Sequence, residues 1–313
     1  MIPCMLVHVD TDFGGDPDDA CAVAMLLGWP DVEIVGVTTN LDPGGTRAGC
    51  VCHLLSRVGR DDIAVAAGSG ASLTTLKRYE STWGDPRYWP EPVEPRPAAP
   101  GAALDLLAQS IASGATVIAI GAFTNMALLE VSRPGSLNGT AVVATAGWLG
   151  PLPQGFPDWG PEMDFNVQCD TQAARLVAAS ADLTLVTLPA SVKVHLRESD
   201  LPRLRAAGWI GQLLAMQSEA NAIDTNMREL GRSFSALPDD LVNFHWDPVT
   251  CGVAVGWSGV KVHQRRLCTD MEGEVLRFRE APQGRLTRAV LDVGADQFRE
   301  RWLRSIEAVQ SRH

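Results

Sequence analysis

The sequence has 313 residues, of which 46% are apolar, and carries a formal net charge of −11. This acidic balance argues against nucleic acid or an anionic membrane as a partner, because such partners need a basic face. No apolar run reaches the roughly 20 residues that span a bilayer, and the first residues lack the basic stretch of a signal peptide. Seven cysteines without a CxxC pair are typical of reduced thiols, which predicts a cytoplasmic protein.

The predicted elements alternate between strand and helix along most of the chain. Apolar runs predict strands at residues 5–9, 32–39, 63–66, 116–120, 141–145 and 183–188. Helical spacing predicts helices at 20–27, 46–58, 102–113, 124–131 and 170–179, a mostly helical part from residue 201, and a closing helix at 298–309. Two long loops are expected. The loop 82–101 is rich in proline and tryptophan, and the loop 147–161 is rich in glycine, proline and tryptophan.

This alternation predicts an α/β fold with a mostly parallel, doubly wound, Rossmann-like sheet flanked by helices and a helical C-terminal part. Two domains would fit the length. The chain contains no repeat and no linker-like stretch, so we predict a single domain over residues 1–313.

A run of carboxylates follows the first predicted strand. Asp10, Asp12, Asp16, Asp18 and Asp19 lie within ten residues, between that strand and the next helix. Parallel sheets place ligands just beyond such strand ends. A capped helix start accounts for one Asp but not for five. Five like charges repel one another, so the run predicts a neutralising cation, and oxygen ligands favour Ca²⁺ or Mg²⁺.

Five segments, in order along the chain, resemble motifs of the inosine–uridine-preferring nucleoside hydrolase family. They are the run from Asp10 to Ala20, Val37-Thr38-Thr39-Asn40, the stretch from Ile120 to Asn125, Asp164-Phe165-Asn166 with Asp170 and Ala173-Ala174, and Trp246-Asp247-Pro248. Each segment alone is a weak signal, but their order makes the set specific.

The resemblance implies a Ca²⁺-dependent enzyme that hydrolyses the N-glycosidic bond of a ribonucleoside to free base and ribose. It implies that Asp12, Asp19, Asp247 and the backbone carbonyl of Ile120 hold Ca²⁺, which also binds a water and ribose hydroxyls. Asp18 would take the proton of that water, since a carboxylate beside a cation can act as general base near neutral pH. Relatives of this kind also imply a homo-oligomer, either a dimer or a tetramer.

The first loop departs from the family pattern because it is two residues longer. As a result, Asp16 keeps the usual spacing from Asp12, while Asp18 keeps its place in the Asp-Asp pair. We favour Asp18 as the base, because the helix start follows the pair, and Asp16 remains the alternative.

Further substrate contacts follow from the same resemblance. Asn40, Asp164 and Asn166 are predicted to bind the ribose. Trp246 stands where the inosine–uridine branch has a histidine, as in the purine-specific branch, and is therefore predicted to stack on a purine base. Trp83 or Trp89, in the proline-rich loop, could cover the opposite face of the base, and we choose Trp83.

Two other functions compete with this interpretation. An Asp-x-Asp after the first strand also begins haloacid-dehalogenase-like phosphatases, with Asp10 as nucleophile, Asp12 as acid and Mg²⁺ bound. Such enzymes need a Thr or Val where this chain has Gly14, and Lys193 is the only lysine that fits their pattern. A non-catalytic Ca²⁺-dependent nucleoside- or sugar-binding protein is the second alternative, because a fold does not determine function.

Overall fold

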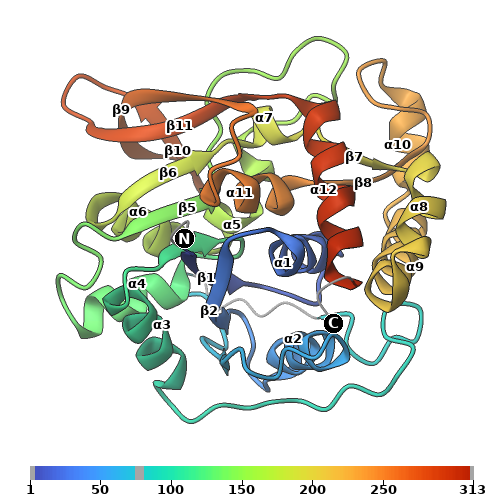
Figure 1. The fold of residues 1–313 in the computed structure, drawn as a ribbon. Helices are drawn as coiled ribbons and strands as arrows, with labels where there is room; N and C mark the ends of the chain where they lie inside the picture. Colours follow the sequence, from blue (N-terminus) through green and yellow to red (C-terminus); the bar gives the residue numbers. More distant parts are fainter. Residues whose placement is uncertain (1–3, 75–80, 311–313) are drawn as a thin grey trace.

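The computed structural model describes residues 4–74 and 81–310 of the chain (Figure 1). In this part, nine strands form one sheet in the order β10-β9-β11-β6-β5-β4-β1-β2-β3. The seven strands from β11 to β3 run parallel, and β9 and β10 extend the sheet antiparallel beyond β11. These strands are β1 (Met5–Thr11), β2 (Val32–Thr39), β3 (Val65–Ala67), β4 (Thr116–Ala119), β5 (Ala141–Thr145), β6 (Asp182–Val186), β9 (Val260–Glu272), β10 (Val275–Glu280) and β11 (Arg285–Val293). A separate antiparallel pair consists of β7 (His195–Arg197) and β8 (Leu241–Phe244).

Helices cover both faces of the sheet. They are α1 (Asp18–Gly28), α2 (Thr46–Arg57), α3 (Ala102–Ala112), α4 (Thr124–Ser132), α5 (Phe165–Cys169), α6 (Thr171–Ser180), α7 (Leu188–Ser191), α8 (Leu201–Ala206), α9 (Gly208–Asp224), α10 (Met227–Ser233), α11 (Trp246–Ala254) and α12 (Ala295–Gln310). Among the described residues, no helix is both long and apolar enough to cross a membrane.

Two apolar cores lie on the two faces of the sheet, and strand β4 contributes to both. Ile118 belongs to the core under α1, α2, α9, α11 and α12, whereas the neighbouring Val117 belongs to the core under α3, α4 and α6. Successive side chains of a strand point to opposite faces, so a strand covered on both faces is apolar throughout. This accounts for the continuous apolar runs in the parallel strands and confirms the predicted fold class.

All eleven residues of helix α1 are buried. It packs against α11 and α12, and the indole N–H of Trp302 in α12 donates a hydrogen bond to the carbonyl of Cys21 at 3.1 Å. A Cβ at Gly28 would lie 1.7 Å from the carbonyl oxygen of Ser305. Glycine therefore permits the close approach of these two helices at the C-terminal end of α1.

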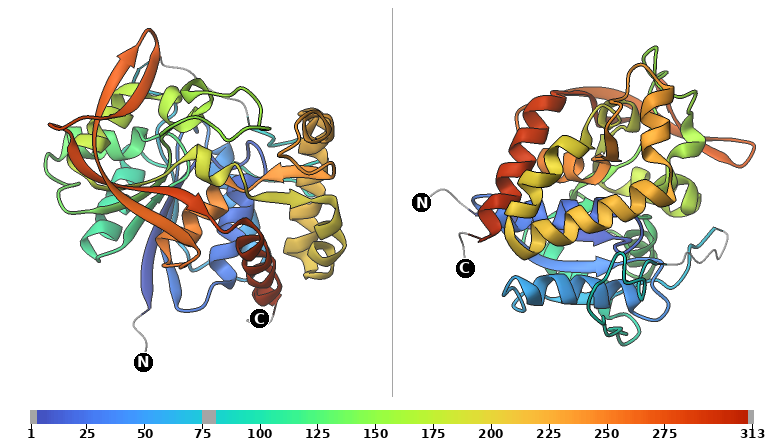
Figure 2. Two further views of the ribbon diagram at one scale, coloured as in Figure 1. Left: turned by 90° about the horizontal axis from the view of Figure 1, so that it is seen from above. Right: turned by 90° about the vertical axis from the view of Figure 1, so that its right-hand side faces the viewer.

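The predicted helical C-terminal part is correct for α8, α9, α10, α11 and α12, but it is wrong for β8 and for residues 260–293. The latter form strands β9, β10 and β11, and the β9–β10 hairpin extends away from α8, α9, α10 and α12 (Figure 2). Most of β9 is exposed or half-buried, so its sequence is dominated by charged and polar residues rather than by an apolar alternation. Gly273, with a positive φ of 63°, turns the chain between β9 and β10.

Candidate active site

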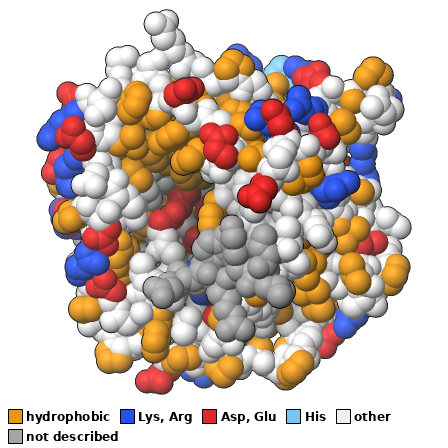
Figure 3. Space-filling view, turned by 180° about the vertical axis from the view of Figure 1, so that it is seen from behind, with side chains coloured by type: hydrophobic (Ala, Val, Ile, Leu, Met, Phe, Trp, Pro, Cys, Tyr) orange, Lys and Arg blue, Asp and Glu red, His pale blue; other side chains and the backbone are white. Residues whose placement is uncertain are grey.

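Strand β1 lies between β4 and β2 in the sheet. After β1 the chain continues to β2 on one side and later crosses to β4 on the other. Such a reversal opens a crevice beyond the carboxyl ends of parallel strands. A cavity of about 620 Å³ occurs there. Figure 3 shows a hollow with acidic side chains on its floor and hydrophobic side chains nearby. The described residues that line the cavity are Asp12, Gly15, Asp16, Asp18, Asp19, Arg47, Ile120, Thr145, Trp148, Trp159, Met163, Asp164, Phe165, Asn166, Leu188, Thr225, Met227, Leu230, Phe244, Trp246 and Asp247.

Asp10 lies behind the cavity and supports the first strand. Its Oδ1 accepts hydrogen bonds from the hydroxyl of Thr38 at 2.6 Å and from Nδ2 of Asn125 at 2.7 Å. Its Oδ2 accepts a longer bond of 3.4 Å from Nδ2 of Asn40. Burial raises the pKa of Asp10 to about 6, against the effect of these bonds. The Asp10 carboxylate therefore ties β1 to β2 and α4.

The long first loop ends in a turn just before α1. Oδ1 of Asp16 accepts a hydrogen bond from the backbone N–H of Asp18 at 2.9 Å, where α1 begins. This bond, which spans two residues, closes an Asx-turn. Asp16 is exposed, whereas Asp18 is buried. The two alternative bases thus lie in different surroundings within one cavity.

Asp18 is held by the start of another helix. Its Oδ2 accepts a hydrogen bond from the backbone N–H of Asp247 at 2.9 Å. Its Oδ1 lies 4.0 Å from Nδ1 of the buried His245. Burial, followed by the charges of Asp16 and Asp19, raises the pKa of Asp18 well above its usual range.

The predicted metal ligands Asp12, Asp19, Asp247 and Ile120 all line the acidic end of the cavity. The hydroxyl of Thr11 donates a short hydrogen bond to Asp19. Burial and then the charges of neighbouring carboxylates raise the pKa of both Asp19 and Asp247. Among the described residues, no group of three or more Asp, Glu, His or Cys side chains has the arrangement that would hold a metal ion. The structure therefore brings the four residues together, and their metal binding stays a prediction.

The turn after β4 brings the Ile120 backbone close to the first strand. The N–H of Ile120 donates a hydrogen bond to the carbonyl of Asp10 at 2.9 Å. A Cβ at Gly121 would lie 2.6 Å from Nδ2 of Asn40 and 2.7 Å from the backbone nitrogen of Asp12. Glycine at this position lets the three strand ends meet at the floor of the cavity.

Asp164 and Asn166 line the cavity, and each also has a structural role. The Asp164 carboxylate accepts hydrogen bonds from the N–H of Gly147 at 2.6 Å and of Val167 at 3.3 Å, so it caps α5. Burial raises its pKa to about 7. Nδ2 of Asn166 donates to the carbonyl of Thr145 at 3.1 Å, which fixes the amide at the end of β5.

Two predicted substrate contacts lie elsewhere in the structure. Asn40 is buried and is not among the described residues that line the cavity. Trp83 is also absent from that lining, and its indole N–H donates to the carbonyl of Val93 at 2.7 Å. That bond holds Trp83 against its own loop. The structure thus does not bring Trp83 to the cavity, and we correct the prediction that it faces the base.

The apolar end of the cavity is built from aromatic rings. Trp246 stacks on Phe244 with ring centroids 5.0 Å apart and an angle of 26° between the planes. Trp159 meets Phe244 edge-on at 5.8 Å. The residues of this wall that were not predicted are Trp148, Trp159, Met163, Phe165, Met227, Leu230 and Phe244. Trp148 and Trp159 lie in the 147–161 loop, whose length and tryptophan content were the available signal.

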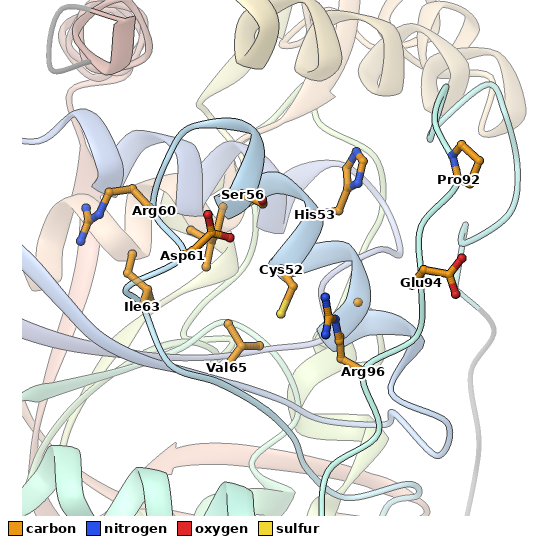
Figure 4. Close-up of a pocket in the computed structure, with 12 residues that line it drawn as sticks. Cys52, His53, Ser56, Arg60, Asp61, Ile63, Val65, Pro92, Glu94 and Arg96 are labelled. Carbon is orange, nitrogen blue, oxygen red and sulfur yellow. The ribbon is translucent and has the colours of Figure 1, made fainter.

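A second cavity of about 280 Å³ lies between α2 and the segment 92–96 (Figure 4). Its lining mixes opposite charges, with Arg60 and Arg96 beside Asp61 and Glu94. It shares no described lining residue with the acidic cavity and contains none of the carboxyl ends of β1, β4 and β5. The acidic cavity is therefore the candidate active site.

Comparisons with known proteins identify the family of this chain. A family model described as inosine-uridine preferring nucleoside hydrolase matches residues 7–300. The pyrimidine-specific ribonucleoside hydrolase RihA of Salmonella schwarzengrund is 29% identical over 213 residues, which are 64% of this chain and 66% of the relative. RihA of Citrobacter koseri is 30% identical over 63% of this chain and 65% of the relative. The chain thus matches just under two thirds of the length of these curated relatives.

Solved structures of similar fold cover nearly the whole chain. A plant nucleoside hydrolase, the PpNRh1 enzyme, superposes with a TM-score of 0.81 at 22% identity, over 97% of this chain and 99% of that one. A purine-preferring ribonucleoside hydrolase from Gardnerella vaginalis has a TM-score of 0.80 at 19% identity, over 98% and 100%. Since the family model matches residues 7–300, this chain belongs to the inosine-uridine preferring nucleoside hydrolase family.

Proposed function

We propose that this protein hydrolyses the N-glycosidic bond of ribonucleosides, purine nucleosides first among them, to free base and ribose, with Ca²⁺ as cofactor. The observation that supports this most is the polarity of one cavity. Asp12, Asp18, Asp19 and Asp247 line its acidic end, and Trp246 lines its aromatic end. A nucleoside has the matching polarity, with a hydroxyl-rich sugar at one end and a flat ring at the other.

The residues at the acidic end fit a divalent cation. After burial, the charge of Asp12 helps to raise the pKa of both Asp19 and Asp247, so a cation among these carboxylates relieves their repulsion. With the carbonyl of Ile120 they offer oxygen ligands alone, and a flexible oxygen set favours Ca²⁺ over Mg²⁺, which demands a tight octahedron. When bound, Ca²⁺ supplies a positive charge that lowers the pKa of water.

The chain's own residues divide the remaining work. The Asp18 carboxylate accepts the proton of the attacking water, with its Oδ2 held by the N–H of Asp247. Asp164 and Asn166 hold ribose hydroxyls where they line the cavity. Asn40 is not part of the described lining, and its predicted contact with the sugar is supported only by its Oδ1, which is buried and has no hydrogen-bond partner in the described structure.

The aromatic end supports the preference for purines. Trp246 and Phe244 form a stacked pair, and a larger ring system buries more area against such a surface. The curated relatives are named pyrimidine-specific, whereas a structural neighbour is named purine-preferring, so the base must be measured. A cytoplasmic location and a dimeric or tetrameric state remain parts of the proposal.

The phosphatase alternative has little support. Nζ of Lys193, the lysine it requires, pairs with Asp292 at 3.0 Å and lies outside the described lining of the cavity.

To test hydrolysis, the protein is incubated with inosine, guanosine, adenosine, uridine and cytidine, and base and ribose are separated by chromatography. Equimolar base and ribose support the proposal. Binding of nucleosides without products would instead establish the non-catalytic alternative.

A further inference from the structure

Arg47, at the start of α2, places a positive charge inside the acidic cavity. It is the only Lys or Arg among the described residues that line this cavity, and it is 2% exposed. No predicted ligand or substrate contact involves it. A buried guanidinium in a cavity lined by six carboxylates therefore requires a role of its own.

Hydrogen bonds fix the guanidinium against the first loop. Nε of Arg47 donates to the carbonyl of Leu41 at 3.2 Å, and Nη1 donates to the carbonyl of Phe13 at 3.1 Å. Nη1 also donates to the carbonyl of Asp12. A Cβ at Gly15 would lie 3.7 Å from Nη1, so the guanidinium lies along the backbone between Asp12 and Asp16.

The position of Arg47 has an electrostatic consequence. Its guanidinium lines the same cavity as the carboxylates of Asp12 and Asp16 and is bonded to the backbone of Asp12. Asp12 is at the same time a predicted ligand of the divalent cation. The fixed guanidinium and a bound cation thus lie beside the same residue, and two positive charges in a partly buried site repel each other.

We propose that Arg47 is a built-in counter-cation of the carboxylate cluster, which stabilises the cluster without metal and lowers its affinity for the divalent cation. This inference rests on the proposed function, because it takes the acidic end of the cavity to be the Ca²⁺ site. It makes Arg47 a positioning residue that sets the affinity of the site, with no contact to the reacting atoms.

The consequence is measurable as an affinity. Removing the charge in Arg47→Gln destabilises the metal-free protein and tightens Ca²⁺ binding by at least about tenfold, since repulsion between nearby charges is worth a few kcal/mol. Arg47→Lys keeps the charge but not the planar set of donors, so its affinity stays near that of the wild type. Arg57→Gln is the matched control, because Arg57 lies on the same helix and pairs with Glu91 at the surface.

The experiment is calorimetric titration of CaCl₂ into the metal-free full-length chain and its variants, with the melting temperature recorded with and without Ca²⁺. Tighter binding and a larger Ca²⁺-induced rise in melting temperature in Arg47→Gln alone support the inference. Equal or weaker binding in Arg47→Gln, or equal tightening in Arg47→Lys, overturns it. If Arg47→Gln does not fold without Ca²⁺ but folds with it, the result counts as support.

If Arg47→Gln folds under neither condition, Arg47→Met replaces it and is judged by the same criteria. The failure of the inference can be told apart from that of the proposed function. Ca²⁺ binding by the wild type with no change in the variant rejects only the role of Arg47. Absence of Ca²⁺ binding in every protein, the wild type included, rejects both that role and the Ca²⁺ dependence of the proposed function.

Discussion

The backbone N–H of Asp247 donates a hydrogen bond to the carboxylate of Asp18 at 2.9 Å, although 229 positions separate the two residues. Asp18 opens α1 and Asp247 lies in the first turn of α11, so the starts of two buried helices meet at one carboxylate. This bond fixes the orientation of the proposed base relative to a proposed metal ligand. The packing of α1 against α11 therefore sets the position of Asp18 relative to Asp247, which the proposed hydrolysis requires.

Asp18→Asn is expected to lower kcat by about 10²–10⁴, because an amide cannot accept the water proton. Metal binding should persist, since the amide oxygen can still accept the N–H of Asp247. Asp16→Asn is the matched control, because its amide oxygen can also keep the bond to the Asp18 N–H. Steady-state kinetics and Ca²⁺ titration of both variants provide the measurement. A large loss in Asp16→Asn alone would identify Asp16 as the base.

The buried carboxyls of Asp10 and Asp164 are expected to contribute less to the stability of the metal-free protein as the pH rises from 5 to 8, whereas the buried histidines, whose pKa burial lowers, act in the opposite direction. Burial raises the pKa of Asp164 to about 7 and that of Asp10 to about 6, whereas an unfolded Asp titrates near 4. The folded state therefore binds more protons, so this stability is complete below about pH 4 and is lost as the pH rises through about 6 to 7. Melting temperatures of the wild type and of Asp164→Asn in EDTA across this range test it, because the histidines are the same in both proteins and the difference reports the Asp164 carboxyl. The wild type should lose stability relative to the variant as the pH rises, and a gain relative to the variant would contradict the prediction.

Trp246→Ala is expected to lower kcat/KM for inosine by about three- to tenfold, since an aromatic contact is worth ~0.5–1.5 kcal/mol beyond burial. The loss for uridine should be smaller, because its single ring covers less of the indole. Trp83→Ala serves as the control, because Trp83 is not part of the described cavity lining. An equal loss for both nucleosides in Trp246→Ala would show that Trp246 only supports the wall.

Gly28→Ala is expected to destabilise the fold by about 1–3 kcal/mol, the cost of overpacking a core. Its Cβ would lie 1.7 Å from the carbonyl oxygen of Ser305, so α1 and α12 would have to separate. Gly44→Ala is the matched control, since no atom lies within 4 Å of a Cβ at that position. Urea unfolding of both variants compares them. Equal stabilities would show that the contact between α1 and α12 is loose.

The parallel half of the fold could be predicted from sequence because its strands are covered on both faces. Residues 32–39 and 141–145 are nearly continuous apolar and β-branched runs, and the structure confirms both strands at both ends. Residues 260–293 could not be predicted in the same way. Strands with little burial do not need an apolar alternation, so the charged sequence of β9 conceals its strand pairing.

The acidic half of the candidate site was predictable because its residues cluster in sequence around strand ends. The aromatic half was not, since Trp159 in a loop and Phe244 in β8 meet only after folding. Arg47 was missed for a similar reason. One arginine near a helix start is ordinary in a sequence, and only the folded loop reveals that its guanidinium lies beside Asp12.

The Ca²⁺ dependence of nucleoside hydrolysis tests the central claim most directly. The release of ribose from inosine is measured before and after treatment with excess EGTA, and again after addition of Ca²⁺ or Zn²⁺. Because the proposed ligands Asp12, Asp19, Asp247 and Ile120 offer oxygen alone, chelation should abolish the release and Ca²⁺ should restore it better than Zn²⁺. Full activity in excess EGTA would contradict the account.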